Sequence, residues 1–528
     1  MALSLRATPS SLAPLRRSPF RELFAAQLAS NVGTWMQTVA AQWLMITLEH
    51  SALKVALVQT AISLPVVLLA LPAGALGDIV DRRRLLIASQ ILALSAAGLL
   101  AGLTLADRIG AWSLLGLTLA VGVGDALRRP AWQALQPQLV PRDQIPQAAT
   151  LNSANMNVAR ALGPALGGAL VAAAGPGWVF LVNGVSYLAV LGVLLPWRSE
   201  QQRSGLGPER MGSAVRAGAR FARSSPRLRA VLARTALFLM FASALWALLP
   251  VVAERQLDLG SGGYGLLLGC VGGGAVLGAA LLPSLRARRS LDAVISLAAV
   301  AFAAACVGLA TVHMVVPALA VLVLAGVAWV TTLGCLMGTA QTILPSWVGA
   351  RGMALFLLVF HSGQAGGAVL WGAVADRTGT DVAFLVVAAG LVAGLVAVPR
   401  YRVRSGEDLD LSPSGHWTEP QLALDRDPGA APVLVTVEYR VPPENHSDFR
   451  DAMQAVGRAR RRSGATRWSL FQDAADPEKF VEAFVLPSWE EHLRQHERIT
   501  VADRRFEERA HALLADGETP RVTRLLAT

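Results

Sequence analysis

Residues 163–181 read GPALGGALVAAAGPGWVFL, and residues 367–385 read GAVLWGAVADRTGTDVAFL. The stretches lie 204 positions apart (367 − 163) and share three glycines and a Phe-Leu pair in one register. The same offset places Leu139-Val140-Pro141 on Ile343-Leu344-Pro345. A register kept without a gap through such apolar sequence indicates two copies of one membrane unit. Duplicated membrane halves are typical of transporters, whose binding site lies between the repeats near the bilayer midplane.

The composition also favours a membrane protein. Of 528 residues, 53% are hydrophobic and only 16% charged, and the mean hydropathy is +0.47; soluble proteins average about 25% charged residues. The excess of 47 Lys and Arg over 36 Asp and Glu lies before residue 431. A basic excess in membrane loops reflects topology, so no nucleic-acid partner is expected. Cys270, Cys306 and Cys335 lie in apolar runs without paired spacing, so neither a disulfide nor a metal site is expected.

Apolar stretches of about 20 residues, the length that spans a bilayer, fall into two sets of six. The first set is 22–48, 54–77, 85–106, 111–136, 148–173 and 178–196. The second set is 230–253, 262–284, 290–312, 315–341, 350–375 and 380–399. The sequence therefore predicts an all-α membrane protein of twelve transmembrane helices in two six-helix pseudo-repeats, followed by a small soluble domain.

The expected organisation has six parts. They are a leader (1–19), a first bundle (20–196), a central loop with a short amphipathic helix (197–229), a second bundle (230–399), a flexible linker (400–430) and a soluble domain (431–528). Arginines gather in the leader, the central loop and alternate short loops, which predicts that this side and both termini are cytoplasmic. The long first span lacks a cleavage site and is expected to be an anchor.

Residues 74–84, GALGDIVDRRR, resemble the signature loop of the major facilitator superfamily, although Ile79 and Asp81 depart from the common form. Residues 130–133 (PAWQ), 151–155 (LNSAN) and 160–168 (RALGPALGG) resemble the bacterial exporter branch that includes enterobactin efflux proteins. The resemblance implies alternating access and ion-coupled export from the bacterial inner membrane. The implied substrate is a small organic molecule such as a siderophore, antibiotic or drug, driven by the proton gradient without a cofactor.

The signature loop predicts a cytoplasmic latch. Asp78 ends the second span, where it could accept hydrogen bonds from the free amides at the start of the eleventh span, with Arg128 or Arg129 as a cationic partner. The predicted latch residues are Gly74, Asp78, Arg82, Arg128 and Arg129. For Arg82 to Arg84, the alternative is a role as topology anchors alone.

Span five contains Gly163, Pro164, Gly167 and Gly168. Small residues at this spacing allow close helix approach, and a proline inside a helix removes a hydrogen bond and bends it. The resemblance makes this the antiporter motif of exporters; simple close packing is the alternative.

Charges inside a membrane are costly and tend to be functional. Asp125 lies well inside span four, with Arg128 at i+3 on the same face, and is the predicted proton carrier. A structural ion pair is the alternative. Arg160, on span five, is predicted either to neutralise Asp125 or to meet an anionic substrate.

Polar residues of several spans are candidates for the substrate cavity. They are Gln27, Asn31, Thr34, Thr38, Asn155, His361 and Gln364, with Trp246 as an aromatic wall. The alternative is that these polar groups bond neighbouring helices, as polar groups in lipid must.

The soluble part predicts the order βαββαβ of a ferredoxin-like fold. The strands are expected at 433–440, 466–473, 479–486 and 521–526, and the helices at 444–462 and 488–514. Residues 488–492 (SWEEH) with Gln495-His496 resemble the dimeric α/β barrel family of antibiotic-biosynthesis monooxygenases, which implies a homodimer. His492 and His496 are expected on the charged surface of a helix, and dimerisation or regulation is favoured over catalysis.

Two functions remain open at this point. One is a proton-coupled exporter, which is not an enzyme and whose partners are a small molecule and the lipid bilayer. The other is a membrane-anchored enzyme or sensor whose soluble domain carries the activity. The repeat and the intramembrane charges favour the exporter, because an anchor needs a single helix.

Overall fold

The apolar stretches form long helices in the computed structural model of the chain, which describes residues 12–79, 82–135, 139–196, 211–417 and 431–527. The chain divides into two units. The helical unit comprises residues 1–208, 234–335 and 357–399, and the tail unit comprises 209–233, 336–356 and 400–528. Side chains at positions 70–82 lie outside the described part.

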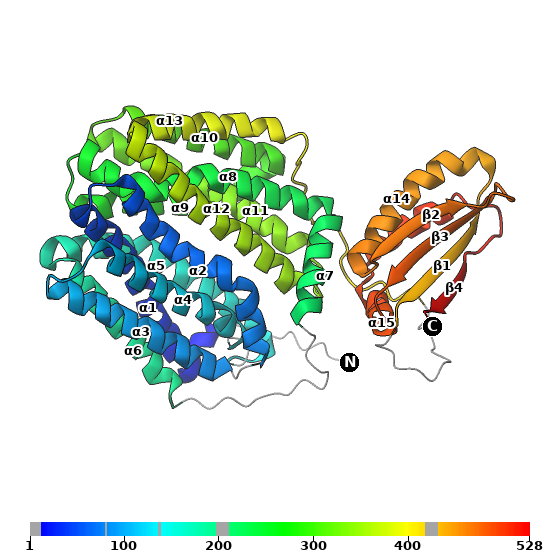
Figure 1. Ribbon diagram of the computed structural model, residues 1–528, viewed down its shortest axis with the longest axis horizontal. Helices are drawn as coiled ribbons and strands as arrows, with labels where there is room; N and C mark the ends of the chain where they lie inside the picture. Colours follow the sequence, from blue (N-terminus) through cyan, green and yellow to red (C-terminus); the bar gives the residue numbers. More distant parts are fainter. Residues whose placement is uncertain (1–11, 80–81, 136–138, 197–210, 418–430, 528) are drawn as a thin grey trace, which may run out of the picture. The chain divides into compact units, whose positions relative to one another are not determined.

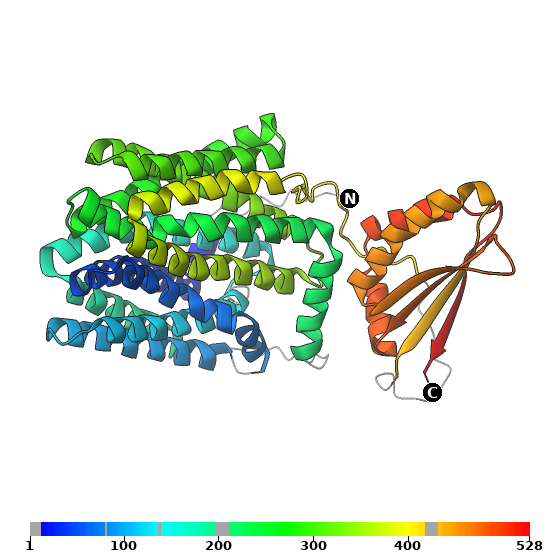
Figure 2. The same cartoon turned by 45° about the horizontal axis from the view of Figure 1, so that its top comes forward.

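Two sets of six helices follow the predicted spans within a few residues (Figures 1 and 2). The first set is α1 (Ser18–Leu48), α2 (Ala52–Ile79), α3 (Arg82–Leu105), α4 (Ala111–Leu135), α5 (Ile145–Ala174) and α6 (Pro176–Leu194). The second set is α8 (Pro226–Val251), α9 (Ser261–Arg288), α10 (Leu291–Thr311), α11 (Val315–Ile343), α12 (Gly349–Thr378) and α13 (Thr380–Ala393). Between them lies α7 (Met211–Ser224), the short helix expected in the central loop.

Among the described residues, ten helices are long and apolar enough to cross a membrane. Helices α1 and α4, with 31 and 25 residues, are as long but are not among the ten. Helix α1 buries Gln27, Asn31, Gln37 and Gln42, and α4 carries Asp125, Arg128 and Arg129. These polar groups lower the mean hydropathy of the two helices.

The duplication seen in the sequence is confirmed in the backbone. Gly175 (φ +89°) ends α5 and begins α6, and Gly379 (φ +91°), 204 residues later, ends α12 and begins α13. Only glycine adopts this conformation readily. Phe180 and Phe384, which follow them, are both fully buried. The two halves therefore share their turns as well as their helices.

Two further glycines of the repeat lie where the halves meet. A methyl group built on Gly168 of α5 would lie 2.7 Å from the Cα of Gly265 in α9. Its repeat counterpart, Gly372 of α12, would place a methyl group 3.0 Å from the Cα of Leu53 in α2. In both the α5–α9 and the α12–α2 contact, the backbone of one helix therefore packs directly against the backbone of the other, and the two contacts are equivalent in the repeat.

The two ends of the helical unit differ in composition. The arginine-rich end is where α1 and α3 begin and α9 terminates, with Arg17, Arg83 and Arg288. At the opposite end α2 and α9 begin and α5 and α12 terminate. The Gly168 and Gly372 contacts lie nearer the opposite end.

The C-terminal domain of the tail unit has a four-stranded antiparallel sheet in the order β2-β3-β1-β4. The strands are β1 (Val433–Arg440), β2 (Arg467–Gln472), β3 (Lys479–Leu486) and β4 (Arg521–Leu526). The helices are α14 (His446–Ser463), α15 (Trp489–Arg498) and α16 (Val501–His511). One face of the sheet packs on side chains of α14 and α16, including Phe449, Met453 and Ala510; Figure 1 shows α14 along the sheet.

The helix expected over 488–514 is in fact two helices, so that prediction was wrong. Thr500 accepts a hydrogen bond from the amide of Asp503, whose carboxylate in turn accepts from the Thr500 amide. This capping box starts a new helix after Ile499. The Thr-x-x-Asp pattern lies inside an apparently continuous helical stretch, which hides the break between the two helices.

The linker expected to be flexible over 400–430 is partly fixed to the C-terminal domain. The amide of Ser414 donates to the Ile499 carbonyl, and the amides of Val501 and Ala502 donate to carbonyls of Ser412 and Asp410. Residues 418–430 lie outside the described part. Residues 410–417 therefore belong structurally to the domain rather than to a linker.

Substituting Gly379 by alanine should destabilise the protein by about 1–3 kcal/mol, because its backbone conformation is strained for any residue with a Cβ. A Cβ at Gly379 would contact nothing within 4 Å, so the loss is a backbone effect. Gly366→Ala, in the same helix with ordinary helical geometry and equal space, is the control. Thermal unfolding in detergent compares the two, and equal losses would contradict the repeat-turn assignment.

Candidate functional site

A pocket lies between the two halves of the helical unit. Three tryptophans and one arginine dominate its wall, and its other lining residues are apolar or glycine. The lining residues are Trp35, Arg160, Pro164, Trp246, Leu268, Val271, Gly272, Ala275 and Trp329. They come from α1, α5, α8, α9 and α11, so both repeats contribute, as expected for a transporter site.

Arg160 lies at mid-depth in the membrane part. It is 15 residues from the first residue of α5 (160 − 145) and 14 from the last (174 − 160), or about 22 and 21 Å along the helix. Its guanidinium lies 5.7 Å from the ring centroid of Trp35. No ion pair to Arg160 is formed by the side chains that the structure describes.

Asp125 is paired with Arg128, not with Arg160. The Arg128 Nη2 lies 2.9 Å and Nε 3.2 Å from the same Asp125 oxygen, one turn along α4. Arg128 is buried, and Asp125 is half-buried. The pair predicted at i+3 is formed.

Three of the predicted cavity residues are used to join α1 to α5. Gln27 donates to Asn31 (2.8 Å), Asn31 donates to Asn155 (2.9 Å), and Asn155 donates to the Phe24 carbonyl (3.1 Å). All three side chains are buried. The structure therefore places them in a helix–helix contact, the alternative that the sequence left open.

The remaining predicted cavity residues are dispersed. Thr34 and Thr38 bond carbonyls one turn earlier in α1. His361 and Gln364 are buried on α12, and Nδ1 of His361 has no hydrogen-bond partner among the described residues. Of this set, only Trp246 lines the pocket.

The predicted helix motif of α5 packs in two directions. Methyl groups on Gly163 and Gly167 would collide with Trp35 and Met36 of α1, and one on Gly168 would collide with α9. The carbonyl of Pro164 faces Gly265 of α9. Helix α5 is therefore held between its own half and the other by its smallest residues.

Polar contacts join the halves toward the opposite end. Asp376 of α12 accepts from the Ser51 hydroxyl (2.6 Å) and the Ala52 amide (2.5 Å) at the start of α2. Gln42 of α1 donates to the Trp246 carbonyl and accepts from the Tyr264 hydroxyl. Asp376 was missed in the sequence, although the repeat gave a signal: the equivalent position of the first half is the uncharged Ala172.

The predicted latch falls mostly outside the described side chains. Gly74 and Asp78 lie in α2 and Arg82 begins α3, but their side chains are not among those described. Arg129 is exposed near the end of α4. Beside the loop, Arg83 donates to the carbonyls of Leu194 and Leu195 at the end of α6, as an anchoring arginine would.

The family model described as transmembrane secretion effector matches residues 9–528. The chain belongs to this family of MFS transporters. The multidrug efflux pump Tap of Mycolicibacterium fortuitum is 27% identical over 424 residues, which are 75% of this chain and 98% of Tap. The staphyloferrin A transporter of Staphylococcus aureus (strain NCTC 8325 / PS 47) is 26% identical over 174 residues, 33% of this chain and 44% of that protein.

Solved structures show the same fold for this MFS transporter. A bacterial homolog of the human lysosomal transporter Spinster matches with TM-score 0.55 and 16% identity, over 75% of this chain and 96% of that one. A POT family transporter in complex with 5-aminolevulinic acid matches with TM-score 0.60 and 12% identity, over 73% and 97%. The sequence prediction of a major facilitator is therefore confirmed at the level of family and fold.

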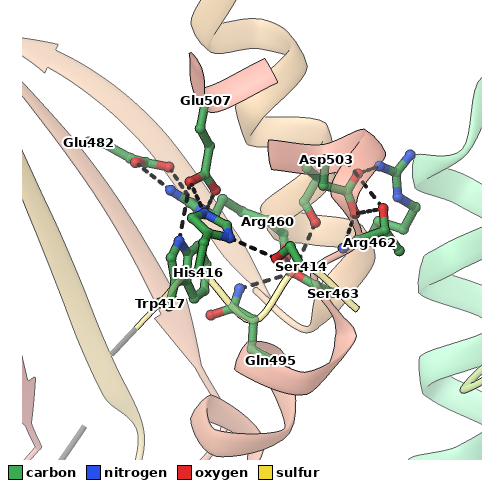
Figure 3. A network of polar contacts seen from close by, with 12 residues as sticks. Ser414, His416, Trp417, Arg460, Arg462, Ser463, Glu482, Gln495, Asp503 and Glu507 are labelled. Atoms are coloured by element: carbon green, nitrogen blue, oxygen red, sulfur yellow. Dashed lines mark hydrogen bonds and ion pairs between the residues drawn. The ribbon is translucent and has the colours of Figure 1, made fainter. Parts of the chain in front are cut away.

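In the C-terminal domain of the transporter, a buried ion network fills the space between sheet and helices (Figure 3). Arg460 donates to Glu482 (Nε–Oε1 3.0 Å) and to Glu507 (2.5 Å), with the Trp417 ring 4.7 Å from its guanidinium. His416 lies 3.0 Å from Glu507. Burial alone would raise the pKa of Glu507, but Arg460 and the hydrogen bond from His416 hold that pKa at about 2.

His492 of α15 is buried and His496 is half-buried, so the expectation of a charged surface was wrong for His492. His492 is 2% exposed, and its Nε2 accepts a hydrogen bond from Arg524. Burial lowers the pKa of His492 to about 3, with the charges of His496 and Arg524 acting in the same direction. No metal cluster of three or more ligands occurs among the described residues.

Within the tail unit, the C-terminal domain contacts α7 and the segment before α12. Glu491 pairs with Arg498 (2.6 Å) and Arg220 of α7 (3.4 Å). The Arg498 guanidinium lies 4.7 Å from the ring of Trp347, which packs edge-on against Phe221 of α7. The domain is thus bound to the segment that precedes α12, whose first turn the predicted latch uses.

Acid should destabilise the C-terminal domain, beginning near pH 6.5. His492 stays neutral in the folded state down to about pH 3, whereas in the unfolded chain its pKa is about 6.5. Below pH 6.5 the unfolded state binds a proton that the folded state does not bind. The free energy of unfolding therefore falls by up to about 1.4 kcal/mol for each unit by which the pH is lowered.

The test measures thermal unfolding of the intact protein at pH 7, 6 and 5. Limited proteolysis, read from the release of peptides of β1 and β3, reports the unfolding of the C-terminal domain. His492→Gln should flatten the pH dependence between 6.5 and 5. The exposed His313, between α10 and α11, gives the control variant His313→Gln. An unchanged slope in His492→Gln would contradict the buried neutral histidine.

Proposed function

We propose that the protein is a secondary active exporter that moves a small organic molecule out of a bacterial cell in exchange for protons. The observation that carries the proposal is the pocket between the repeats, lined by Trp35, Arg160 and Trp246. The family places the chain among MFS transporters. Export is favoured because the multidrug efflux pump Tap is matched over nearly its whole length.

In this proposal the twelve long helices all span the plasma membrane, and the arginine-rich end and both termini face the cytoplasm. The contacts of Asp376, Ser51 and Gln42 then close the outer side. Alternating access requires these contacts to break when the site opens outward. Their small number and polar chemistry suit contacts that must form and break in each cycle.

Asp125 is the proposed proton carrier. Its pairing with Arg128 neutralises both groups inside the membrane. Protonation of Asp125 removes that attraction and frees Arg128, which is proposed to join the latch with Asp78, Gly74, Arg82 and Arg129. The pair thereby links proton binding to closure of the cytoplasmic side.

The substrate belongs to the siderophore, antibiotic or drug class. One relative is a staphyloferrin A transporter and another a multidrug efflux pump. The resemblance of residues 151–155 and 160–168 to enterobactin exporters points the same way. No cofactor is required, because the proton gradient supplies the energy.

The C-terminal domain is proposed to have a ferredoxin-like fold and a dimerising, regulatory role. Its strand order supports the fold. The interior between sheet and helices is occupied by Arg460, Glu482 and Trp417, which favours a structural role over an oxygenase site.

The sheet face away from α14 and α16 carries several apolar side chains. By register, Leu434 lies beside Val485 and Leu525, and Val481 lies beside Phe471. Phe471 and Leu525 are 56% and 51% exposed. A second copy of the same face would cover this surface, as the resemblance to dimeric α/β barrels implies.

Export is tested in native cells that carry the intact protein, no protein, Asp125→Asn or a truncation after Pro399. Comparing small molecules inside and outside should show one compound retained in the deletion and the Asp125→Asn cells. The truncation should still export it. If export is unchanged in every strain while a metabolite that requires the C-terminal domain disappears, the domain carries the function and the exporter proposal fails.

Dimerisation is tested by light scattering of the purified full-length protein in detergent. Val481→Lys places a charge beside the exposed Phe471 on this face and should convert a dimer to a monomer. Asp451→Lys, on an exposed position of α14, is the control and should remain dimeric. A monomeric intact protein would contradict the pairing.

A further inference from the structure

We propose that the transported molecule is an anion with a flat aromatic part, bound by Arg160 and the cage of Trp35, Trp246 and Trp329. This inference rests on the proposed exporter function and names the chemistry of its substrate. It is carried by the geometry of the pocket rather than by the identity of any relative.

No side chain that the structure describes forms an ion pair with Arg160. Among the described side chains its contact is the Trp35 face at 5.7 Å, and Asp125 is already paired with Arg128. A cation at mid-depth in a membrane is costly and tends to be kept for a ligand.

Helices α4 and α5 together carry more positive than negative side chains. The charged side chains within α4 and α5 are Asp125, Arg128, Arg129 and Arg160. One negative and three positive charges leave a net charge of +2 (3 − 1). An anionic ligand gains from this charge, whereas a cationic ligand is repelled in a site with little water.

The tryptophans give the site its preference for aromatic groups. The Trp246 and Trp329 rings are T-shaped at 5.3 Å, and Trp35 lies 6.4 Å from Trp246. The indole Nε1 of Trp246 is buried and has no hydrogen-bond acceptor among the described residues. It is therefore a donor available to a substrate oxygen, beside the guanidinium that would bind the charged group.

The binding test uses the purified full-length protein in detergent and three probes of similar shape. They are 2-naphthoate, its neutral methyl ester, and 2-naphthylmethylammonium, titrated against tryptophan fluorescence. The intact protein should bind naphthoate more tightly than the ester and the ester more tightly than the cation. Equal affinities, tighter binding of the cation, or no binding of naphthoate would overturn the proposal.

Three variants separate the loss of charge from a loss of folding. Arg160→Gln should weaken naphthoate binding about tenfold or more, the size of a lost charge-assisted hydrogen bond, while leaving the ester unchanged. Arg160→Lys should restore part of the difference, and Arg288→Gln, exposed at the end of α9, should change nothing. Unchanged naphthoate affinity in Arg160→Gln would overturn the proposal, and ester binding shows that the variant is folded.

The same variants distinguish this inference from the exporter function. If cells export a neutral or cationic compound that does not require Arg160, the exporter stands and the anion site fails. If purified protein binds naphthoate through Arg160 but no compound accumulates in deletion cells, the site stands and the exporter proposal fails.

Discussion

The transporter depends on two places where the halves touch through backbone rather than side chains. Gly168 lies against Gly265 and Ser261 of α9, and Gly372 lies against α2. In lipid there is no hydrophobic force between helices, so close packing of small residues supplies much of the attraction. A single added methyl group at either glycine would separate the halves near the end where Asp376 and Gln42 form their polar contacts.

These glycines also determine the direction in which the Arg160 side chain of α5 extends. Arg160, Pro164 and Gly168 follow one another at four-residue spacing and so share one face of the helix. Since Gly168 and the Pro164 carbonyl lie against α9, the same face carries Arg160 into the pocket between the halves. Gly163 and Gly167, on the neighbouring face, hold α5 to α1 and keep that direction constant. The packing of α5 and the chemistry of the pocket are thus consequences of one short stretch of sequence.

The sequence predicted the helices and the repeat well, because bilayer thickness and glycine geometry act on single stretches of chain. The pairing of Asp125 with Arg128 was also readable, since both lie on one helix. The partner of Asn31 was not: Asn155 is 124 residues away, and periodicity cannot show which polar stripe faces a neighbouring helix. His492 was misplaced for a related reason, because its burial is set by β4, whose Arg524 is 32 residues farther along the chain.

An anionic substrate places a requirement on coupling to protons. In the proposed mechanism, protonation of Asp125 adds one positive charge to the membrane interior, which by itself strengthens binding of an anion. Because binding effects are reciprocal, the bound anion would then strengthen proton binding. The anion and the proton would therefore cross the membrane in the same direction. Exchange in opposite directions therefore cannot arise from charge attraction alone. It requires that release of Arg128 from Asp125 change which side is closed, so that the protonated state faces a different compartment from the anion-bound state. The separation of Arg160 from the Asp125–Arg128 pair suits this division, because one group binds the substrate while the other controls the conformation.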